Sequence, residues 1–271
     1  MRLFDTHAHY NDEKFDEDRE EILKKVFESG VTNLNCVGYN IPSSKKAIEV
    51  AEKFEQINAI IGISPNDLPS FENENIDIKD FFFEDVLKEQ LNEIKNLANK
   101  HKIVAIGEIG LDYYWNKENK KEQKMAFRKQ IEIANELNLP IVIHTRDAIF
   151  DTIEILKNKI MPVKKGIFHC CPLNQQLIKE GLELGFYISF AGPITFKNSK
   201  NAEEVISMVP LDKILIETDC PYLSPEPKRG TRNDSSNIIY IAEKIAKVKG
   251  VSTEEIASIT DSNAKKIFNI D

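Results

Sequence analysis

Cysteine is scarce in this sequence of 271 residues, which contains only four. No two of them have the C-x-x-C spacing of a redox or zinc motif, and four thiols are too few for a disulfide framework. Disulfides persist mainly in oxidising compartments, so a chain of this kind suits a reducing one. The sequence therefore predicts a cytoplasmic protein.

Long apolar runs and an excess of positive charge are also lacking. No stretch approaches the roughly 20 apolar residues of a membrane span, and the first predicted strand begins directly after the charged Arg2, so we expect neither a membrane segment nor a signal peptide. The net charge of -8 argues against a protein that coats nucleic acid through overall positive charge, although a local basic rim around a cleft is compatible with it. Nothing in the sequence indicates an obligate protein partner.

Apolar stretches of strand length alternate with segments whose apolar residues recur at helical spacing. The first predicted strand begins at residue 3, and the others cover 31–37, 57–63, 102–107, 140–143, 165–168, 186–190 and 213–218. The predicted helices cover 16–29, 43–54, a long segment ending near 100, 120–137, 147–159, 174–184, 202–208 and 235–249. Eight strands alternating with eight helices, without a linker between them, are typical of a (β/α)8 TIM barrel of roughly 250 residues. We therefore predict an α/β protein in which residues 1–271 form a single domain.

The end of the chain adds further helices to this pattern. A short helix is predicted after Ser252, which together with Glu255 matches a capping box, and another is predicted from about Asp261. We expect these extra C-terminal helices to cover the outer wall of the barrel.

Histidine is rare as well, but four of the five histidines directly follow predicted strands. Two carboxylates do the same, and in a (β/α)8 barrel all such strand ends open onto one face, where catalysis occurs. The six side chains are His7, His9, Glu108, His144, His169 and Asp219. His101, in the turn before the fourth strand, does not join them. A lone histidine is usually structural, whereas this convergence favours a metal site.

Six ligands exceed what one tetrahedral ion needs, so the set predicts two divalent ions bridged by a carboxylate. Glu108 is the best bridge, because a longer carboxylate can offer one oxygen to each ion. Imidazole with carboxylate suits Zn, Mn, Co or Ni, and Mg is also compatible with carboxylates. Two ions carry more positive charge than Glu108 and Asp219 neutralise, which favours an anionic substrate.

The sequence around these residues resembles the TatD-type metal-dependent deoxyribonucleases, a branch of the amidohydrolase barrels, over essentially the whole chain. The matching stretches are FDTHAH (4–9), GEIGLDYY (107–114), HTRDA (144–148), HC (169–170) and ETDCPYL (217–223), with Pro225, Arg229 and Gly230. Two loops depart from the family pattern: HCCPL (169–173) stands where the family usually has HCFSG, and RGTRNDS (229–235) stands where it has RGKRNEP. These departures concern the rim of the site and leave its metal-binding residues intact.

The resemblance implies roles for the six residues. His7, His9, Glu108 and Asp219 would hold one ion, and Glu108, His144 and His169 would surround the other. Glu108 and Asp219 are the expected catalytic residues, with Asp219 acting on a metal-activated water. The implied activity is hydrolysis of DNA phosphodiester bonds.

Substrate contacts are expected around the same mouth. Arg146, Lys197, Arg229 and Arg232 are candidate phosphate contacts, with ordinary solvated charge as the other interpretation. Tyr113, Tyr114 and Trp115 follow Glu108 closely and either stack on bases or pack in the core.

Two other functions stay open at this point. A hydrolase of small esters, lactones or amides would use the same metal pair, and an inactive barrel would serve as a binding partner. The intact set of ligands argues against the inactive barrel. A cleft lined by arginine and aromatic residues favours nucleic acid, whereas a closed apolar pocket favours a small ester.

Overall fold

The computed structural model describes residues 1–69, 76–100, 102–158 and 160–270, so the prediction for His101 lies outside the described residues. Its eight strands form one parallel sheet in which each strand pairs with the next along the chain. The strands are β1 (Leu3–Ala8), β2 (Val31–Val37), β3 (Ile57–Ile61), β4 (Ile103–Asp112), β5 (Ile141–Arg146), β6 (Ile167–Phe168), β7 (Tyr187–Phe190) and β8 (Ile214–Ile216). This order is the one predicted for a TIM barrel.

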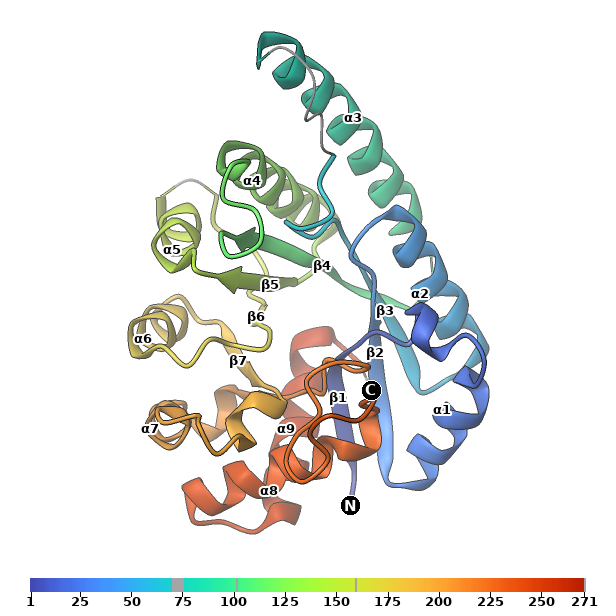
Figure 1. Cartoon of the computed structure of the whole chain (residues 1–271), viewed down its shortest axis with the longest axis vertical. Coiled ribbons are helices and arrows are strands. Elements are labelled where there is room, and N and C mark those ends of the chain that lie inside the picture. Colours follow the sequence, from blue (N-terminus) through green and yellow to red (C-terminus); the bar gives the residue numbers. More distant parts are fainter. Residues whose placement is uncertain (70–75, 101, 159, 271) are drawn as a thin grey trace.

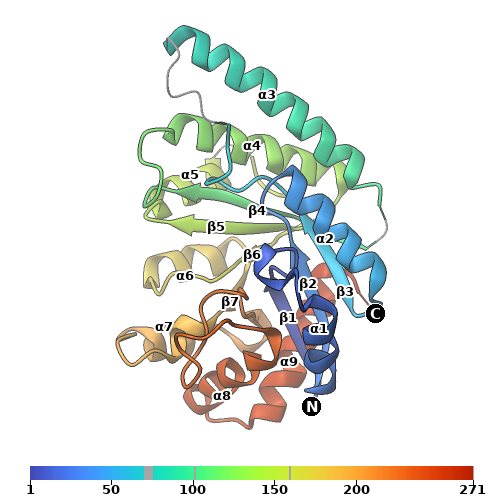
Figure 2. The same ribbon diagram turned by 45° about the vertical axis from the view of Figure 1, so that its right-hand side comes forward.

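The helices follow the strands in turn, with two after the last strand, and all but the last lie wholly outside the strands (Figures 1 and 2). They are α1 (Arg19–Glu28), α2 (Ile41–Lys53), α3 (Ile76–Leu97), α4 (Lys120–Leu137), α5 (Ile149–Asn158), α6 (Gln175–Glu183), α7 (Ala202–Met208), α8 (Ile238–Lys249) and α9 (Thr253–Phe268). Short 3-10 helices cover Glu13–Phe15, Gly192–Thr195, Leu211–Lys213 and Ser235–Asn237. Within the described residues, no helix combines the length and apolarity needed to cross a bilayer.

The barrel closes between its first and last strands just beyond the end of β8. The backbone N–H of Asp219 donates to the carbonyl of His7 at 2.9 Å, and the N–H of His9 donates to the carbonyl of Cys220 at 2.7 Å. These bonds continue the ladder into the loop after β8. They also place Asp219 directly beside His7 and His9.

The C-terminal segment differs from the prediction, because α9 is one continuous helix of 16 residues. Asp261 and Asn263, whose types favour turns, lie inside it. Asn263 donates to the carbonyls of Leu211 and Ile214, and Asp261 lies 3.5 Å from Lys265, so these side chains bond elsewhere instead of competing with the helix backbone.

The position of α9 also differs from the prediction, because this helix does more than cover the outer wall of the barrel. Ala264 and Phe268 pack into a buried cluster whose other members come from all eight strands: Phe4, Val37, Ile60, Val104, Ala105, Val142, Ile167, Tyr187 and Leu215. The rings of Phe4 and Phe268 stack with centroids 6.1 Å apart. The last turns of α9 therefore contribute to the barrel interior, while a second, larger cluster packs the helices onto the sheet.

Candidate metal centre

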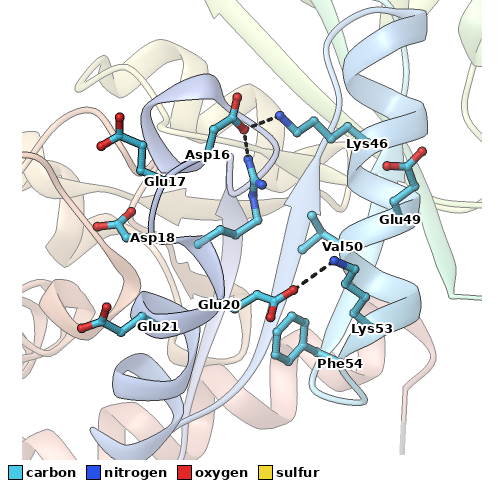
Figure 3. Close-up of a pocket in the computed structure, with 11 residues that line it drawn as sticks. Asp16, Glu17, Asp18, Glu20, Glu21, Lys46, Glu49, Val50, Lys53 and Phe54 are labelled. Atoms are coloured by element: carbon cyan, nitrogen blue, oxygen red, sulfur yellow. Dashed lines mark hydrogen bonds and ion pairs between the residues drawn. The ribbon is translucent and has the colours of Figure 1, made fainter.

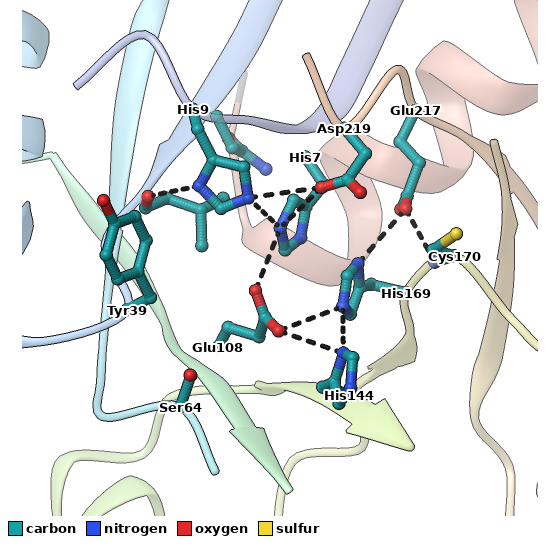
Figure 4. Close-up of polar contacts among 12 residues, drawn as sticks. His7, His9, Tyr39, Ser64, Glu108, His144, His169, Cys170, Glu217 and Asp219 are labelled. Atoms are coloured by element: carbon teal, nitrogen blue, oxygen red, sulfur yellow. Dashed lines mark hydrogen bonds and ion pairs between the residues drawn. The ribbon is translucent and has the colours of Figure 1, made fainter. Parts of the chain in front are cut away.

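The six predicted side chains meet at the carboxyl-terminal ends of the strands (Figure 4). His7 and Glu108 lie within β1 and β4, His144 lies within β5, and His169 directly follows β6. His9 and Asp219 stand in the loops after β1 and β8. The convergence predicted from the strand ends is therefore present.

One glycine allows β4 and β5 to approach closely enough for this arrangement. Gly110 pairs with His144 and has φ of +141°, a conformation that L side chains rarely adopt. A Cβ atom at Gly110 would lie 2.0 Å from the carbonyl oxygen of His144. β4 also continues to Asp112, beyond the predicted end at 107, with a shift of register between Ile106 and Ile109.

The first half of the site is built around His7 and His9. Nε2 of His7 lies 3.2 Å from Nε2 of His9, 3.6 Å from Oε2 of Glu108 and 3.7 Å from Oδ1 of Asp219. Nε2 of His9 lies 3.2 Å from the same oxygen of Asp219. Nε2 of His7 thus lies close to three other potential ligand atoms.

The second half contains the histidines from β5 and β6. Nδ1 of His144 lies 3.1 Å from Oε1 of Glu108, and Nε2 of His169 lies 3.5 Å from that oxygen. The two nitrogens are 3.3 Å apart. Glu108 therefore turns one carboxylate oxygen to each half of the site, as the bridging prediction requires.

Two further carboxylates, which were not among the predicted site residues, hold the histidines of the second half. Oδ2 of Asp112 lies 2.8 Å from Nε2 of His144. Oε1 of Glu217 lies 3.3 Å from Nδ1 of His169 and accepts a hydrogen bond of 2.6 Å from the N–H of Cys170. Both follow the pattern in which a carboxylate fixes the orientation of a metal-binding imidazole.

The hydrogen bonds determine which nitrogen of each ring faces the centre. A carboxylate or carbonyl oxygen only accepts, so it requires the proton on the nitrogen that it contacts. Asp112 and Glu217 act in this way on His144 and His169, and the carbonyl of Val37 lies 2.9 Å from Nδ1 of His9. In a neutral ring the opposite nitrogen then carries the lone pair and is the atom available to a metal ion.

Lone pairs and carboxylate oxygens that face one another repel unless a proton or a metal ion lies between them. Each of three triads brings its ligand atoms within 4.8 Å of one another: His7 with His169 and Asp219, His7 with His9 and Glu108, and Glu108 with His144 and His169. Nitrogen and oxygen donors of this kind suit divalent transition metals. The donor set therefore fits metal ions, and His7, His169 and Glu108 each belong to two of the triads.

Neighbouring groups stabilise the ionised form of both carboxylates at the centre. Burial raises the pKa of Glu108, but His169 and the hydrogen bonds from His144, His169 and His7 outweigh it and hold that pKa well below its usual range. Burial also raises the pKa of Asp219, but contact with His9 outweighs burial and lowers that pKa below its usual value. Both carboxylates are consequently ionised near neutral pH.

The predicted phosphate contacts lie in different surroundings. Arg229 places its guanidinium 4.2 Å from the ring centroid of Phe196, so the loops after β7 and β8 are in contact, and Lys197, the next residue along the chain, is exposed. Arg146 ends β5. Arg232 instead pairs with Asp18 and donates to the carbonyl of Lys14. Within the described part of the chain, only Arg232 of the four has a carboxylate partner.

The three aromatic residues after β4 divide into two groups. Tyr113 is buried, its hydroxyl donates to Asp151 at 2.6 Å, and core packing explains it. Tyr114 and Trp115 are exposed at 48% and 65%, so core packing does not explain them.

A surface hollow between α1 and α2 lies apart from these residues (Figure 3). Its lining includes six carboxylates and three cations, namely Asp16, Glu17, Asp18, Glu20, Glu21, Glu49, Arg19, Lys46 and Lys53, and ion pairs join Asp16 to Lys46 and Glu20 to Lys53. Its negative balance makes it unsuited to an anionic ligand.

Comparison with known proteins agrees with this geometry. The family model described as "TatD related DNase" matches residues 4–269. A Bacillus subtilis protein named "Uncharacterized metal-dependent hydrolase YabD" is 44% identical over 268 residues, which cover 99% of each chain. A Salmonella typhimurium protein named "3'-5' ssDNA/RNA exonuclease TatD" is 30% identical over 273 residues, again 99% of each chain.

A solved structure shows the shared fold. The crystal structure of the TatD homologue YJJV from Escherichia coli K12 superposes with a TM-score of 0.88 at 23% identity, covering 99% of this chain and 98% of that chain. The sequence and fold comparisons concern the whole chain, including every strand that contributes to the site. This chain therefore belongs to the TatD-related DNase family and is a metal-dependent hydrolase of that family.

Proposed function

We propose that this protein is a two-metal deoxyribonuclease that hydrolyses phosphodiester bonds at the carboxyl-terminal mouth of the barrel. The observation that carries the proposal is the position of Glu108, whose two carboxylate oxygens face separate groups of histidines. His7, His9 and Asp219 would hold one ion with Glu108, and His144 and His169 would hold the other with it. When bound, such a pair supplies an activated water and neutralises charge on the phosphoryl group.

The protein's own side chains prepare this chemistry. Asp112 and Glu217 fix the rings of His144 and His169, so these ligands need little rearrangement. Oδ1 of Asp219 contacts His9, whereas no described residue hydrogen-bonds to its Oδ2. This oxygen belongs to an ionised carboxylate at the mouth, and it is our candidate for accepting the proton of the attacking water.

The rim supports a polyanionic substrate over a small ester. Arg146, Lys197 and Arg229 are exposed and none of them has a carboxylate partner among the described residues. Exposed aromatic residues stand at the same mouth. The relative named as an exonuclease of single-stranded DNA and RNA gives this substrate class further support.

The test is reconstitution of metal-stripped protein with Mg, Mn, Co, Ni or Zn, one at a time. Each form is assayed on end-labelled single-stranded and double-stranded DNA, and on a chromogenic ester. We expect metal-dependent shortening of the DNA, with much slower turnover of the ester. Ester hydrolysis without any cleavage of DNA under every metal would overturn the nuclease and favour the small-molecule hydrolase.

A variant of the proposed site serves as the control for this experiment. Glu108→Ala protein, purified in the same way, controls for a contaminating nuclease. Cleavage that persists unchanged in this variant does not arise from the proposed site.

A further inference from the structure

Tyr114 and Trp115 occupy an unusual position at the mouth of the barrel. They follow Tyr113, the first residue after β4, and in both views the turn after β4 lies next to the end of β5 (Figures 1 and 2). Tyr114 is 48% exposed and Trp115 is 65% exposed, so most of the indole surface faces solvent. Large exposed aromatic groups contribute little to folding and often mark binding sites.

Arg146 packs against both rings. Its guanidinium lies 3.8 Å from the ring centroid of Tyr114 and 5.5 Å from that of Trp115, and the two rings meet edge to face with centroids 4.8 Å apart. Arg146 has no carboxylate partner among the described residues, so its charge stays available to an anion. We call these three residues the aromatic platform.

The aromatic platform is tied to the metal centre by short connections. Oδ1 of Asp112 accepts hydrogen bonds from the N–H groups of Tyr114 and Trp115 at 2.9 and 3.0 Å. Oδ2 of the same carboxylate contacts His144 at 2.8 Å. One side chain therefore positions both a predicted metal ligand and the turn that carries the aromatic rings.

The geometry of β5 independently places Arg146 close to His144. His144 and Arg146 are two residues apart on β5, while Thr145 between them is buried toward α5 through a hydrogen bond to Thr152. Residues two apart on a strand share a face and are separated by about 7 Å. Arg146 thus stands above His144 on the side of the mouth.

We propose that the aromatic platform is a subsite for an unpaired nucleobase and its adjoining phosphate in a single-stranded nucleic acid. The proposal rests on the nuclease function and deepens it by specifying the strandedness of the substrate. Aromatic rings stack on any base, and the guanidinium pairs with a phosphate oxygen. The bases of a duplex are already stacked on one another, so an intact duplex offers Trp115 only the outer faces of its terminal base pairs.

The chain provides a direct probe of this subsite, because Trp115 is its only tryptophan. The intrinsic fluorescence of metal-stripped protein is titrated with a single-stranded thymidine oligonucleotide, under conditions that prevent hydrolysis. The comparison ligands are an abasic oligomer of the same length and charge, and a blunt duplex. We expect saturable quenching by the oligonucleotide, with an apparent Kd at least about tenfold lower than for the abasic oligomer or the duplex.

Two outcomes of the titration overturn the subsite. The first is a fluorescence signal that stays unchanged at oligonucleotide concentrations that saturate the enzyme in the activity assay. The second is equal affinity for the oligonucleotide and the abasic oligomer, which would assign the binding to charge alone.

Substitutions give a second readout. Trp115→Ala should raise the KM for the single-stranded oligonucleotide about tenfold, and Trp115→Phe, which keeps an aromatic face, should restore most of the loss. Equal KM values for the parent and Trp115→Ala would contradict the proposal.

The subsite and the nuclease can fail separately. Quenching that follows the expected pattern, without DNA cleavage under any metal, supports the subsite and overturns the nuclease. DNA cleavage without quenching overturns the subsite and leaves the nuclease in place.

Discussion

Oδ2 of Asp112 lies 2.8 Å from Nε2 of His144, and the opposite nitrogen of this ring lies 3.1 Å from Oε1 of Glu108. The carboxylate requires the proton on Nε2, so in the neutral ring Nδ1 carries the lone pair and is the nitrogen available to a metal ion. Glu217 and His169 repeat this arrangement through the other pair of ring nitrogens. Orientation of the histidines thus comes from residues that need not touch a metal themselves.

Asp112→Asn should weaken metal binding at the half of the site that contains His144. An amide cannot accept from the two backbone N–H groups and from His144 at once, so the ring loses the tautomer that presents Nδ1. We expect a loss of about 10- to 100-fold in metal affinity, measured by competition with a chelator. Asp151→Asn is the matched control, because Asp151 contacts Tyr113 and Lys124 and no histidine of the site. Equal losses in both variants would contradict the orienting role.

Glu108→Ala should remove both ions together, because its two oxygens face both halves of the site. His144→Ala should weaken mainly one. Elemental analysis after dialysis against a defined metal buffer measures both contents. A Glu108→Ala protein that keeps two ions and full turnover would rule out the bridge.

Arg229→Ala and Arg232→Ala should differ in their effects on DNA processing. Arg229 has no carboxylate partner among the described residues, so it is free to contact phosphate, whereas Arg232 pairs with Asp18. A contact to a charged group contributes roughly 1.5–3 kcal/mol, so Arg229→Ala should raise KM about tenfold or more. It should also flatten the dependence of KM on salt concentration. Arg232→Ala should alter KM less, and the reverse order of effects would assign the phosphate contact to Arg232 instead.

Phe268→Ala should destabilise the fold, because this ring is 4% exposed and stacks on Phe4. Removal of a buried phenylalanine side chain costs about 3–5 kcal/mol in the free energy of unfolding. Phe150→Ala is the control, since Phe150 is 88% exposed and its loss should change that free energy by less than about 0.5 kcal/mol. Urea unfolding monitored by circular dichroism measures both. Similar values for the two variants would show that α9 does not stabilise the barrel interior.

The barrel was predictable from the sequence because each strand is a short apolar run followed by a helix with its own apolar face. The single helix α9 was not predictable from local signals. Asp261 and Asn263 favour a turn by type, and only their contacts to Lys265, Leu211 and Ile214 make them compatible with a helix interior.

The six candidate ligands were predictable because strand ends in a barrel share one face. Asp112 and Glu217 were not identified, although both lie within the stretches that resemble the family, because their contacts depend on the rotation of a histidine ring. Glu217 stands two residues before Asp219 and Asp112 four residues after Glu108, and this spacing was the available signal. The exposure of Tyr114 and Trp115 likewise depends on the turn after β4.

The most direct measurement is anomalous diffraction from a crystal grown with Mn or Zn, recorded at the absorption edge of the metal. The two-metal centre predicts two peaks about 3.5–4 Å apart, one on each side of the Glu108 carboxylate. A single peak, or peaks that do not contact Glu108, would contradict the bridged pair on which the proposed function depends.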